Sequence, residues 1–198
     1  MVSQEPACPS IIKLLDWCEA EDKFVLIMER PKPCKNLYEF VMVNGGFGEV
    51  EARRLFRQLV EAHQHCEARG VFHRDLKPDN VIIQTSTHNV KLTDFGCGSL
   101  VKDAPFSSFI GAYLFAPPEC FRDEVYYPTP FTVWTLAINL LFIVDGHLPF
   151  ENFRRETLAI PDGLSSGENG ELVHVAQGRL WECMRWGTSL RLGNPSSW

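Results

Sequence analysis

Apolar positions near the start of the chain occur in short runs that are typical of strands. Two such runs, 11–17 and 24–28, are separated by the polar segment CEAEDK at 18–23. A polar break of this length between two short apolar runs predicts an antiparallel hairpin. The segment RPKP at 30–33 then ends the second strand, because proline lacks the amide that a strand ladder requires.

Helical spacing dominates the rest of the chain. The clearest amphipathic pattern covers residues 49–68 and ends before Gly70. Residues 133–144 are apolar on nearly all sides, which predicts a helix buried in the core. Shorter helices are expected at 36–43 and 171–186. The apolar stripe of the 49–68 helix consists of Ala52, Leu55, Phe56, Leu59, His63 and Cys66.

Two more short strands, 81–84 and 90–93, interrupt this helical pattern. The resulting order is a hairpin, a polar connector at 30–35 and a mostly helical body. This order predicts an α+β fold.

The charge balance excludes some classes of partner. The 198 residues include 19 basic and 25 acidic side chains, and the net charge of −6 argues against nucleic acid or an anionic membrane as the main partner. The longest apolar stretch, 136–144, contains Asn139 and is shorter than a membrane span. No basic region followed by an apolar one opens the chain. We therefore expect neither export nor membrane insertion, and a location in the cytoplasm or the nucleus.

The cysteine pattern does not indicate a disulfide framework or a zinc site. Seven cysteines are widely spaced and form no C-x-x-C pair, which favours reduced thiols. His63, His65 and Cys66 lie close together on the 49–68 helix. Because neighbouring helix positions point about 100° apart, these three residues cannot all face one metal ion.

Three motifs carry the chemistry. Residues 71–81 read VFHRDLKPDNV and match the pattern H-R-D-L-x-x-x-N at every specified position. Residues 94–96 read DFG, and residues 116–119 read APPE. In this order, the motifs resemble the catalytic loop, the metal-binding tripeptide and the end of the activation segment of protein kinases.

The resemblance implies roles for individual residues. Phosphoryl transfer depends mainly on positioning and charge neutralisation. Asp75 would accept or orient the proton of the attacking hydroxyl, and Lys77 would reach the transferred phosphate as a point charge. Asn80 and Asp94 offer hard oxygen ligands for the Mg²⁺ that accompanies ATP. Arg74 would pair with a phosphate or a carboxylate of the activation segment.

The hinge region resembles the Pim serine/threonine kinases in particular. Residues 25–33 read VLIMERPKP and residues 36–40 read NLYEF, and Pim kinases are unusual in placing a proline, here Pro31, at the hinge. The segment from Asp94 to Glu119 is also similar to the Pim activation segment.

This resemblance covers residues 9–152 and implies further contacts. Met28 would lie at the back of the adenine pocket, and the carbonyl of Glu29 would meet the adenine amine beside Pro31. Asp79 would help to select basic substrates. The sequence DLKP, which contains Lys77, resembles the corresponding motif of kinases that modify serine or threonine.

The chain also departs from the kinase pattern. A kinase domain carries a glycine-rich loop, a lysine strand and a helix with a partner glutamate before the first strand seen here, and the eight residues before Pro9 cannot hold them. Residues 44–50, NGGFGEV, have Val43 where the glycine-rich motif begins, so we expect a helix-ending loop. Ala112 stands where the family has threonine. Thr132 stands where most kinases, though not Pim kinases, have aspartate.

These features divide the chain into four parts. Residues 1–30 are expected to be the last two strands of the N-lobe and residues 31–35 the hinge. Residues 36–160 would form the mostly helical C-lobe, and residues 161–198 a divergent C-terminal segment.

The sequence leaves three functional hypotheses. The first is a monomeric serine/threonine kinase that transfers the ATP γ-phosphate to protein substrates, with weak activity in this chain because transition-state contacts are missing. The second is a non-catalytic, pseudokinase-like interaction module that uses the C-lobe as a binding surface. The third is a chain that does not fold stably alone, because the strand pair exposes an unpaired edge.

Overall fold

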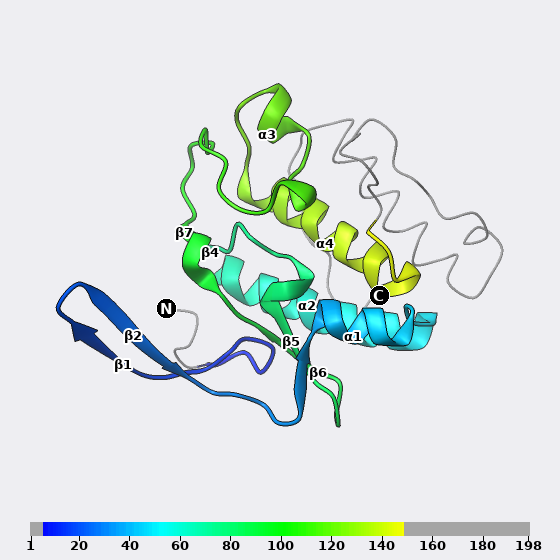
Figure 1. Cartoon of the computed structure of the whole chain (residues 1–198). Helices are drawn as coiled ribbons and strands as arrows, with labels where there is room; N and C mark the ends of the chain where they lie inside the picture. Colours follow the sequence, from blue (N-terminus) through cyan, green and yellow to red (C-terminus); the bar gives the residue numbers. More distant parts are fainter. Residues whose placement is uncertain (1–5, 149–198) are drawn as a thin grey trace.

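Two long helices form the centre of the fold. In the computed structural model, which describes residues 6–148, α2 (Glu49–Ala68) packs against α4 (Pro128–Asp145). The shorter α1 (Leu37–Asn44) and α3 (Glu119–Arg122) lie at the ends of this pair (Figure 1). The expected helix at 171–186 and the expected segment 161–198 lie outside the described residues.

The bounds of α2 agree with the prediction, and its apolar face is buried. All six residues of the predicted stripe are buried, with Leu55 and Leu59 fully so. α1 begins one residue later than predicted because Asn36 acts as its N-cap, its side-chain oxygen accepting a hydrogen bond from the Glu39 amide at 2.7 Å. These two helices confirm the periodic pattern.

The predicted buried helix is confirmed but is longer than expected. α4 begins at Pro128 instead of residue 133, since proline fits the first turn of a helix, and Gly146 ends it in the left-handed conformation. By length and mean hydropathy (1.3) α4 could cross a membrane. Because 78% of this stretch is buried against the rest of the protein, α4 is the core helix of the described domain.

Three small antiparallel sheets complete the part of the fold that the structure describes. β1 pairs with β2, β3 with β5 and β5 with β6, and β4 pairs with β7. The strands are β1 (Leu14–Ala20), β2 (Lys23–Met28), β3 (Cys34–Asn36), β4 (Val71–Phe72), β5 (Val81–Gln84), β6 (Asn89–Leu92) and β7 (Ser99–Leu100).

The sequence prediction placed some strands inaccurately. The first strand runs from Leu14 to Ala20 instead of 11–17, because Ile11 forms a parallel bridge with Leu92 and the pairing with β2 continues into the predicted polar break. β6 lies one residue earlier than expected. β3, β4 and β7 were not predicted, since two or three residues are too few to show a period.

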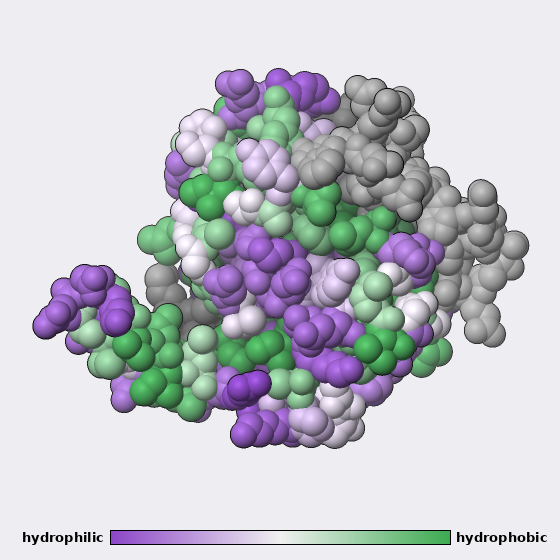
Figure 2. Space-filling model, viewed as in Figure 1, coloured by the Kyte–Doolittle hydropathy of each residue, from purple (hydrophilic) through white to green (hydrophobic). Residues whose placement is uncertain are grey.

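The β1–β2 hairpin projects from the body of the protein (Figure 1). Its apolar side chains are exposed on both faces, including Trp17 (56% exposed) and Phe24 (66%). Figure 2 shows this arm as an apolar surface with a polar tip. At its root, the Glu29 amide donates to the Lys13 carbonyl at 2.9 Å. The hairpin is therefore anchored at its base, while its apolar faces stay uncovered by the described residues.

A glycine fastens the loop after α1 to the end of α4. Gly46 has φ 92°, and a Cβ at this position would lie 2.5 Å from the carbonyl oxygen of Val144. Next to it, the Phe47 amide donates to the Ile143 carbonyl at 2.9 Å. The close approach of two backbones requires a residue without a side chain.

We predict that Gly46→Ala lowers the free energy of unfolding by about 2 kcal/mol or more, because the new methyl group meets backbone atoms that cannot rotate away. Urea unfolding of the full chain, followed by tryptophan fluorescence, measures this change. Gly48→Ala is the matched control, since a Cβ there meets no atom within 4 Å. Equal stability of the two variants would contradict the packing of this loop.

Candidate active site

The HRD motif forms a hydrogen-bonded cluster around one carboxylate. Asp75 is buried, with 7% of its surface exposed. Its Oδ2 accepts hydrogen bonds from Lys77 Nζ at 2.8 Å and from Asn80 Nδ2 at 3.0 Å. Its Oδ1 accepts from the backbone amide of Ala112 at 2.8 Å. Because a buried carboxylate without donors is costly, these three bonds hold Asp75 in one orientation.

Asn80 closes the loop that carries Asp75. It ends the 3₁₀ turn η1 (Pro78–Asn80), and its Nδ2 also donates to the Asp75 carbonyl at 2.9 Å. Since both bonds come from the amide nitrogen, the amide oxygen points away from Asp75. The Thr93 amide donates to the Asn80 carbonyl at 2.9 Å, which holds the segment before Asp94 beside the loop.

Asp94 begins the turn η2 (Phe95–Cys97) that follows β6. It is exposed, has φ 59°, and its Oδ1 accepts a hydrogen bond at 3.2 Å from the amide two residues later. The pKa of Lys77 is raised, first by its hydrogen bond with Asp75 and then by the negative charges of Asp75, Asp79 and Asp94. The structure thus brings Asp75, Lys77 and Asn80 into direct contact. Asp79 and Asp94 lie close enough to Lys77 to interact with its charge.

The donor set fits a magnesium ion that is shared with phosphates. Mg²⁺ prefers oxygen ligands and binds proteins through one or two side chains, with phosphate and water completing its shell. Asn80 and Asp94 supply such oxygens on neighbouring segments. Within residues 6–148, no three His, Cys, Asp or Glu side chains gather to form a metal cage. The metal role of Asn80 and Asp94 stays a prediction.

His73 links the catalytic loop to the strand pair behind it. Its Nε2 donates to the Thr93 carbonyl at 3.0 Å, and its Nδ1 accepts from the Asp75 amide at 3.3 Å. One donor and one acceptor define a neutral imidazole. Burial lowers the pKa of His73, although the bond to Thr93 and nearby carboxylates act in the other direction. His73 therefore positions Asp75 through the backbone.

Arg74 contacts different groups from those expected. Its guanidinium donates to the Ser108 carbonyl at 2.7 Å and to the Tyr126 hydroxyl at 2.6 Å, and lies 5.0 Å from the centre of the Phe106 ring. Arg74 was expected to pair with a phosphate or a carboxylate, whereas the groups it contacts here are uncharged. Tyr126 and Phe106 were missed by the sequence analysis, because isolated aromatic residues carry no motif.

Gly111 brings the activation segment up to Asp75. Its φ is 127°, and a Cβ here would lie 2.5 Å from the Arg74 carbonyl oxygen and 3.3 Å from Asp75 Oδ1. A glycine is thus required for the amide of Ala112 to reach the carboxylate. The missing hydroxyl at Ala112 leaves this backbone bond in place.

An open groove lies beside the cluster. Lys77, Asp79 and Asn80 form one side of it, and residues 112–115 form the other. Its volume is about 740 Å³. Asp79, the residue expected to contact basic substrates, is exposed in this groove. The groove is open to solvent, so an extended polypeptide segment has access to Lys77 and Asn80, which donate hydrogen bonds to Asp75.

The hinge residues lie at the root of the hairpin. Glu29 Oε1 accepts from Lys91 Nζ at 2.6 Å and from the Lys13 amide at 2.9 Å. Burial raises the pKa of Glu29, but these bonds outweigh it and the net pKa is lowered. Glu29 and Pro31 line a pocket of about 480 Å³ that Met28 does not line. The expected adenine contacts of these three residues stay predictions.

Comparison with known proteins identifies the family. Residues 1–165 match the family described as the protein kinase domain. The chain belongs to the protein kinase family. It is 37% identical to serine/threonine-protein kinase pim-2 of Danio rerio over 147 residues, which are 74% of this chain and 47% of that protein.

Other serine/threonine kinases are similarly related. Identity to serine/threonine-protein kinase prk-2 of Caenorhabditis elegans is 38%, covering 72% of this chain and 32% of that protein. Identity to NUAK family SNF1-like kinase 1 of Homo sapiens is 34%, covering 90% of this chain and 26% of that protein. The chain thus spans less than half the length of these curated relatives. Its fold is the α+β protein kinase fold, with several small sheets and four helices in residues 6–148.

Behind His73 lies a second buried histidine, which generates a pH prediction. His63 is 4% exposed, and burial lowers its pKa to about 3, with a smaller contribution from its electrostatic interaction with His73. In the unfolded chain a histidine has a pKa of about 6.5. Below that pH the unfolded state binds a proton that the folded state excludes, so stability falls as the pH falls.

Between pH 7 and pH 5, we predict that His63 alone removes about 2 kcal/mol from the free energy of unfolding. His63→Leu should lose stability less steeply over this range, because leucine does not titrate. Urea unfolding at pH 7, 6 and 5 compares the two chains. Parallel pH profiles for the wild type and His63→Leu would show that His63 is not buried in its neutral form.

Proposed function

We propose that this chain is a Pim-like serine/threonine protein kinase that transfers the γ-phosphate of ATP to hydroxyls of protein substrates. The main support is the position of Asp75. Three donors hold its carboxylate, and the residues that supply them line an open groove. A carboxylate fixed in this way can accept a hydrogen bond from an incoming hydroxyl and orient it for attack.

Lys77 supplies positive charge next to this carboxylate. Its ammonium lies 2.8 Å from Asp75 Oδ2, and its side chain is 28% exposed on the groove side. The raised pKa keeps Lys77 protonated at neutral pH. A cation here attracts the transferred phosphate and stabilises the charge that spreads over its oxygens.

ATP and Mg²⁺ are the proposed cofactors. Asn80 and Asp94 would hold the ion, which when bound neutralises phosphate charge. The adenine would lie against Met28, the Glu29 backbone and Pro31. The Glu29–Lys91 ion pair at 2.6 Å supports this assignment, because it ties the hinge to β6, the strand that leads to Asp94.

Asp79 supports a preference for basic substrates. Its carboxylate is exposed in the groove beside Lys77, and it has no side-chain cation of its own among the described hydrogen bonds and ion pairs. A lysine or arginine near the acceptor hydroxyl would find an opposite charge there. We propose serine and threonine as the acceptors, in line with the names of the relatives.

The Pim-like assignment rests on the hinge. Overall identity does not separate the candidates, since pim-2 of Danio rerio and NUAK family SNF1-like kinase 1 differ by only a few per cent in identity to this chain. The hinge sequence ERPKP, with Pro31, is the feature that favours Pim kinases. We also propose that the protein acts as a monomer in the cytoplasm or the nucleus, with no nucleic acid or membrane partner.

A non-catalytic interaction module is the alternative function. The observation that favours it is the exposed hairpin, on which Leu15, Trp17, Phe24 and Leu26 are each more than half exposed. Exposed apolar surface of this kind often marks a protein interface. An interaction module does not need to bind a nucleotide, so a measurement of ATP binding distinguishes it from a kinase.

We predict slow but specific phosphoryl transfer by the purified chain, below the roughly 1–100 s⁻¹ typical of protein kinases. Asp75→Asn should reduce the rate by about 10²-fold or more, because an amide cannot accept the proton. Transfer of radiolabelled phosphate to a basic serine peptide measures this. Asp103→Asn, which alters an exposed carboxylate of the same sign, is the control and should keep the wild-type rate.

Calorimetric titration with Mg²⁺ and ATP separates the two functions. The kinase hypothesis predicts binding that Asp94→Asn weakens by about tenfold or more, since the negative charge of one metal ligand is lost. A chain that folds cooperatively, binds no ATP and transfers no phosphate would be a scaffold. Turnover within the range typical of protein kinases would contradict the slow rate predicted for this chain.

A further inference from the structure

Arg74, the residue before Asp75, has a strained backbone. Its φ is 69°, in the left-handed region, which a residue with a side chain adopts only where the surrounding structure holds it. Its carbonyl oxygen also lies against Gly111, where a Cβ would be only 2.5 Å away. Because the backbone of Arg74 contacts the activation segment and leads into the catalytic carboxylate, a shift of Arg74 moves Asp75 and the segment that donates to it.

Two oxygen atoms hold the side chain of Arg74. The residue is 8% exposed, and its Nη2 donates to the Ser108 carbonyl at 2.7 Å and to the Tyr126 hydroxyl at 2.6 Å. Within residues 6–148, its buried Nε atom has no hydrogen-bond partner. A buried cation needs acceptors, so loss of the Tyr126 hydroxyl would leave the guanidinium with one described acceptor, the Ser108 carbonyl.

The hydroxyl of Tyr126 links Arg74 to the activation segment. Tyr126 is 2% exposed, and its hydroxyl donates to the Ser108 carbonyl at 2.8 Å. Burial raises the pKa of Tyr126, although its hydrogen bond with Arg74 and the charge of Arg74 act in the other direction, so the hydroxyl keeps its proton at neutral pH. The hydroxyl therefore accepts a hydrogen bond from the guanidinium and donates one to the segment that leads to Gly111 and Ala112.

The ring of Tyr126 is held independently of its hydroxyl. Tyr126 and Phe106 exchange two backbone hydrogen bonds, each of 2.9 Å, and their rings stack with centres 5.7 Å apart. The rings of Phe72 and Phe131 lie 6.4 Å and 5.3 Å from the ring of Tyr126. Tyr126→Phe keeps these contacts and removes only the hydroxyl, so this variant separates positioning from packing.

We propose that Tyr126 is a positioning residue for phosphoryl transfer, whose hydroxyl holds Arg74 in the conformation that places Asp75. Through Arg74, the same hydroxyl keeps the activation segment close enough for the Ala112 amide to donate to Asp75 at 2.8 Å. Tyr126 does not line the groove at Asp75, so it acts without touching the substrate. The inference rests on the proposed kinase function and adds to it a residue that no motif identifies.

Steady-state kinetics of Tyr126→Phe test the proposal on the full chain. We expect kcat to fall by about tenfold or more, the factor that corresponds to one hydrogen bond to a charged group. The KM for ATP should stay within about twofold, because the hinge and the proposed metal ligands are untouched. Both chains are assayed where tryptophan fluorescence shows them to be folded, so a loss of folded protein does not imitate a loss of kcat. An unchanged kcat would overturn the proposal.

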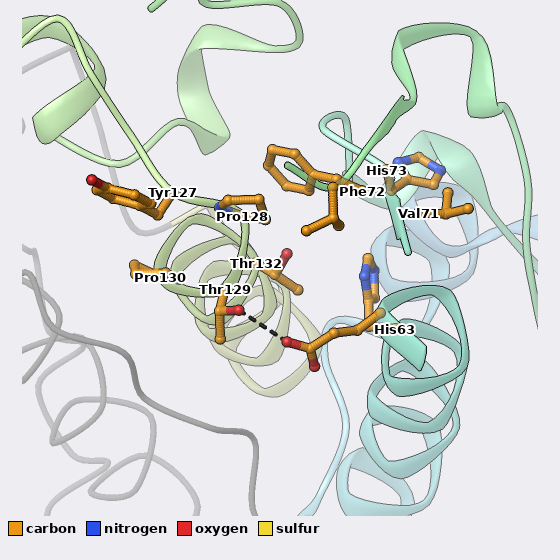
Figure 3. Close-up of a pocket in the computed structure, with 11 residues that line it drawn as sticks. His63, Val71, Phe72, His73, Tyr127, Pro128, Thr129, Pro130 and Thr132 are labelled. Carbon is orange, nitrogen blue, oxygen red and sulfur yellow. Dashed lines mark hydrogen bonds between the residues drawn. The ribbon is translucent and has the colours of Figure 1, made fainter. Parts of the chain in front are cut away.

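Tyr127→Phe is the matched control, because it removes the same hydroxyl at the next position. Tyr127 is 48% exposed, and Figure 3 shows its ring beside Pro128 at the edge of a separate cavity, directed away from Phe72. This variant should keep the wild-type kcat. Equal losses of kcat in Tyr126→Phe and Tyr127→Phe would show that the rate does not depend on the contact with Arg74, and would refute the proposal.

Hydrogen exchange of the Ala112 amide, followed by NMR, separates this proposal from the kinase function because it requires no phosphoryl transfer. Exchange should be about tenfold faster or more in Tyr126→Phe, since the bond from Ala112 to Asp75 is loosened, and unchanged in Tyr127→Phe. A wild-type chain that transfers no phosphate would refute the kinase function, and the exchange rates would still decide whether the Tyr126 hydroxyl holds Ala112 against Asp75. Unchanged exchange in Tyr126→Phe would refute the positioning role at any wild-type rate.

Discussion

The hydrogen bonds to the Asp75 carboxylate organise the candidate active site. Lys77 and Asn80 reach it from the catalytic loop, and the Ala112 amide reaches it from the activation segment. A carboxylate that is 7% exposed needs such donors, because removing it from water without them is unfavourable. The same bonds that satisfy Asp75 therefore join the catalytic loop to the activation segment, which is far from it in sequence.

The rest of the fold supports this contact. α2 and α4 form the core on which the catalytic loop rests, and His73 connects the loop to the segment leading to Asp94. Arg74 fastens the activation segment through Ser108 and Tyr126. Gly111 then allows the backbone to come close enough to donate to Asp75. Each of these contacts would weaken if the core helices shifted, so packing and chemistry are coupled here.

Sequence patterns predicted the features that depend on local order. The bounds of α2 follow from a period of three to four residues, and the motifs identified Asp75, Lys77 and Asn80, which the structure joins. The missed features depend on contacts between distant segments. β4 and β7 are too short to show a period, and the donor at Ala112 is a backbone amide that side-chain identity does not reveal. Burial of His63 was predictable from its place in the apolar stripe of α2.

We propose that Asn80 and Asp94 face one cation beside Asp75. Electron paramagnetic resonance of Mn²⁺ with ADP tests it most directly, because Mn²⁺ takes the same oxygen ligands as Mg²⁺. We predict nucleotide-dependent Mn²⁺ binding that both Asn80→Ala and Asp94→Asn weaken by about tenfold or more. Mn²⁺ binding with unchanged affinity in these two variants, or no nucleotide-dependent binding by the folded wild-type chain, would contradict it.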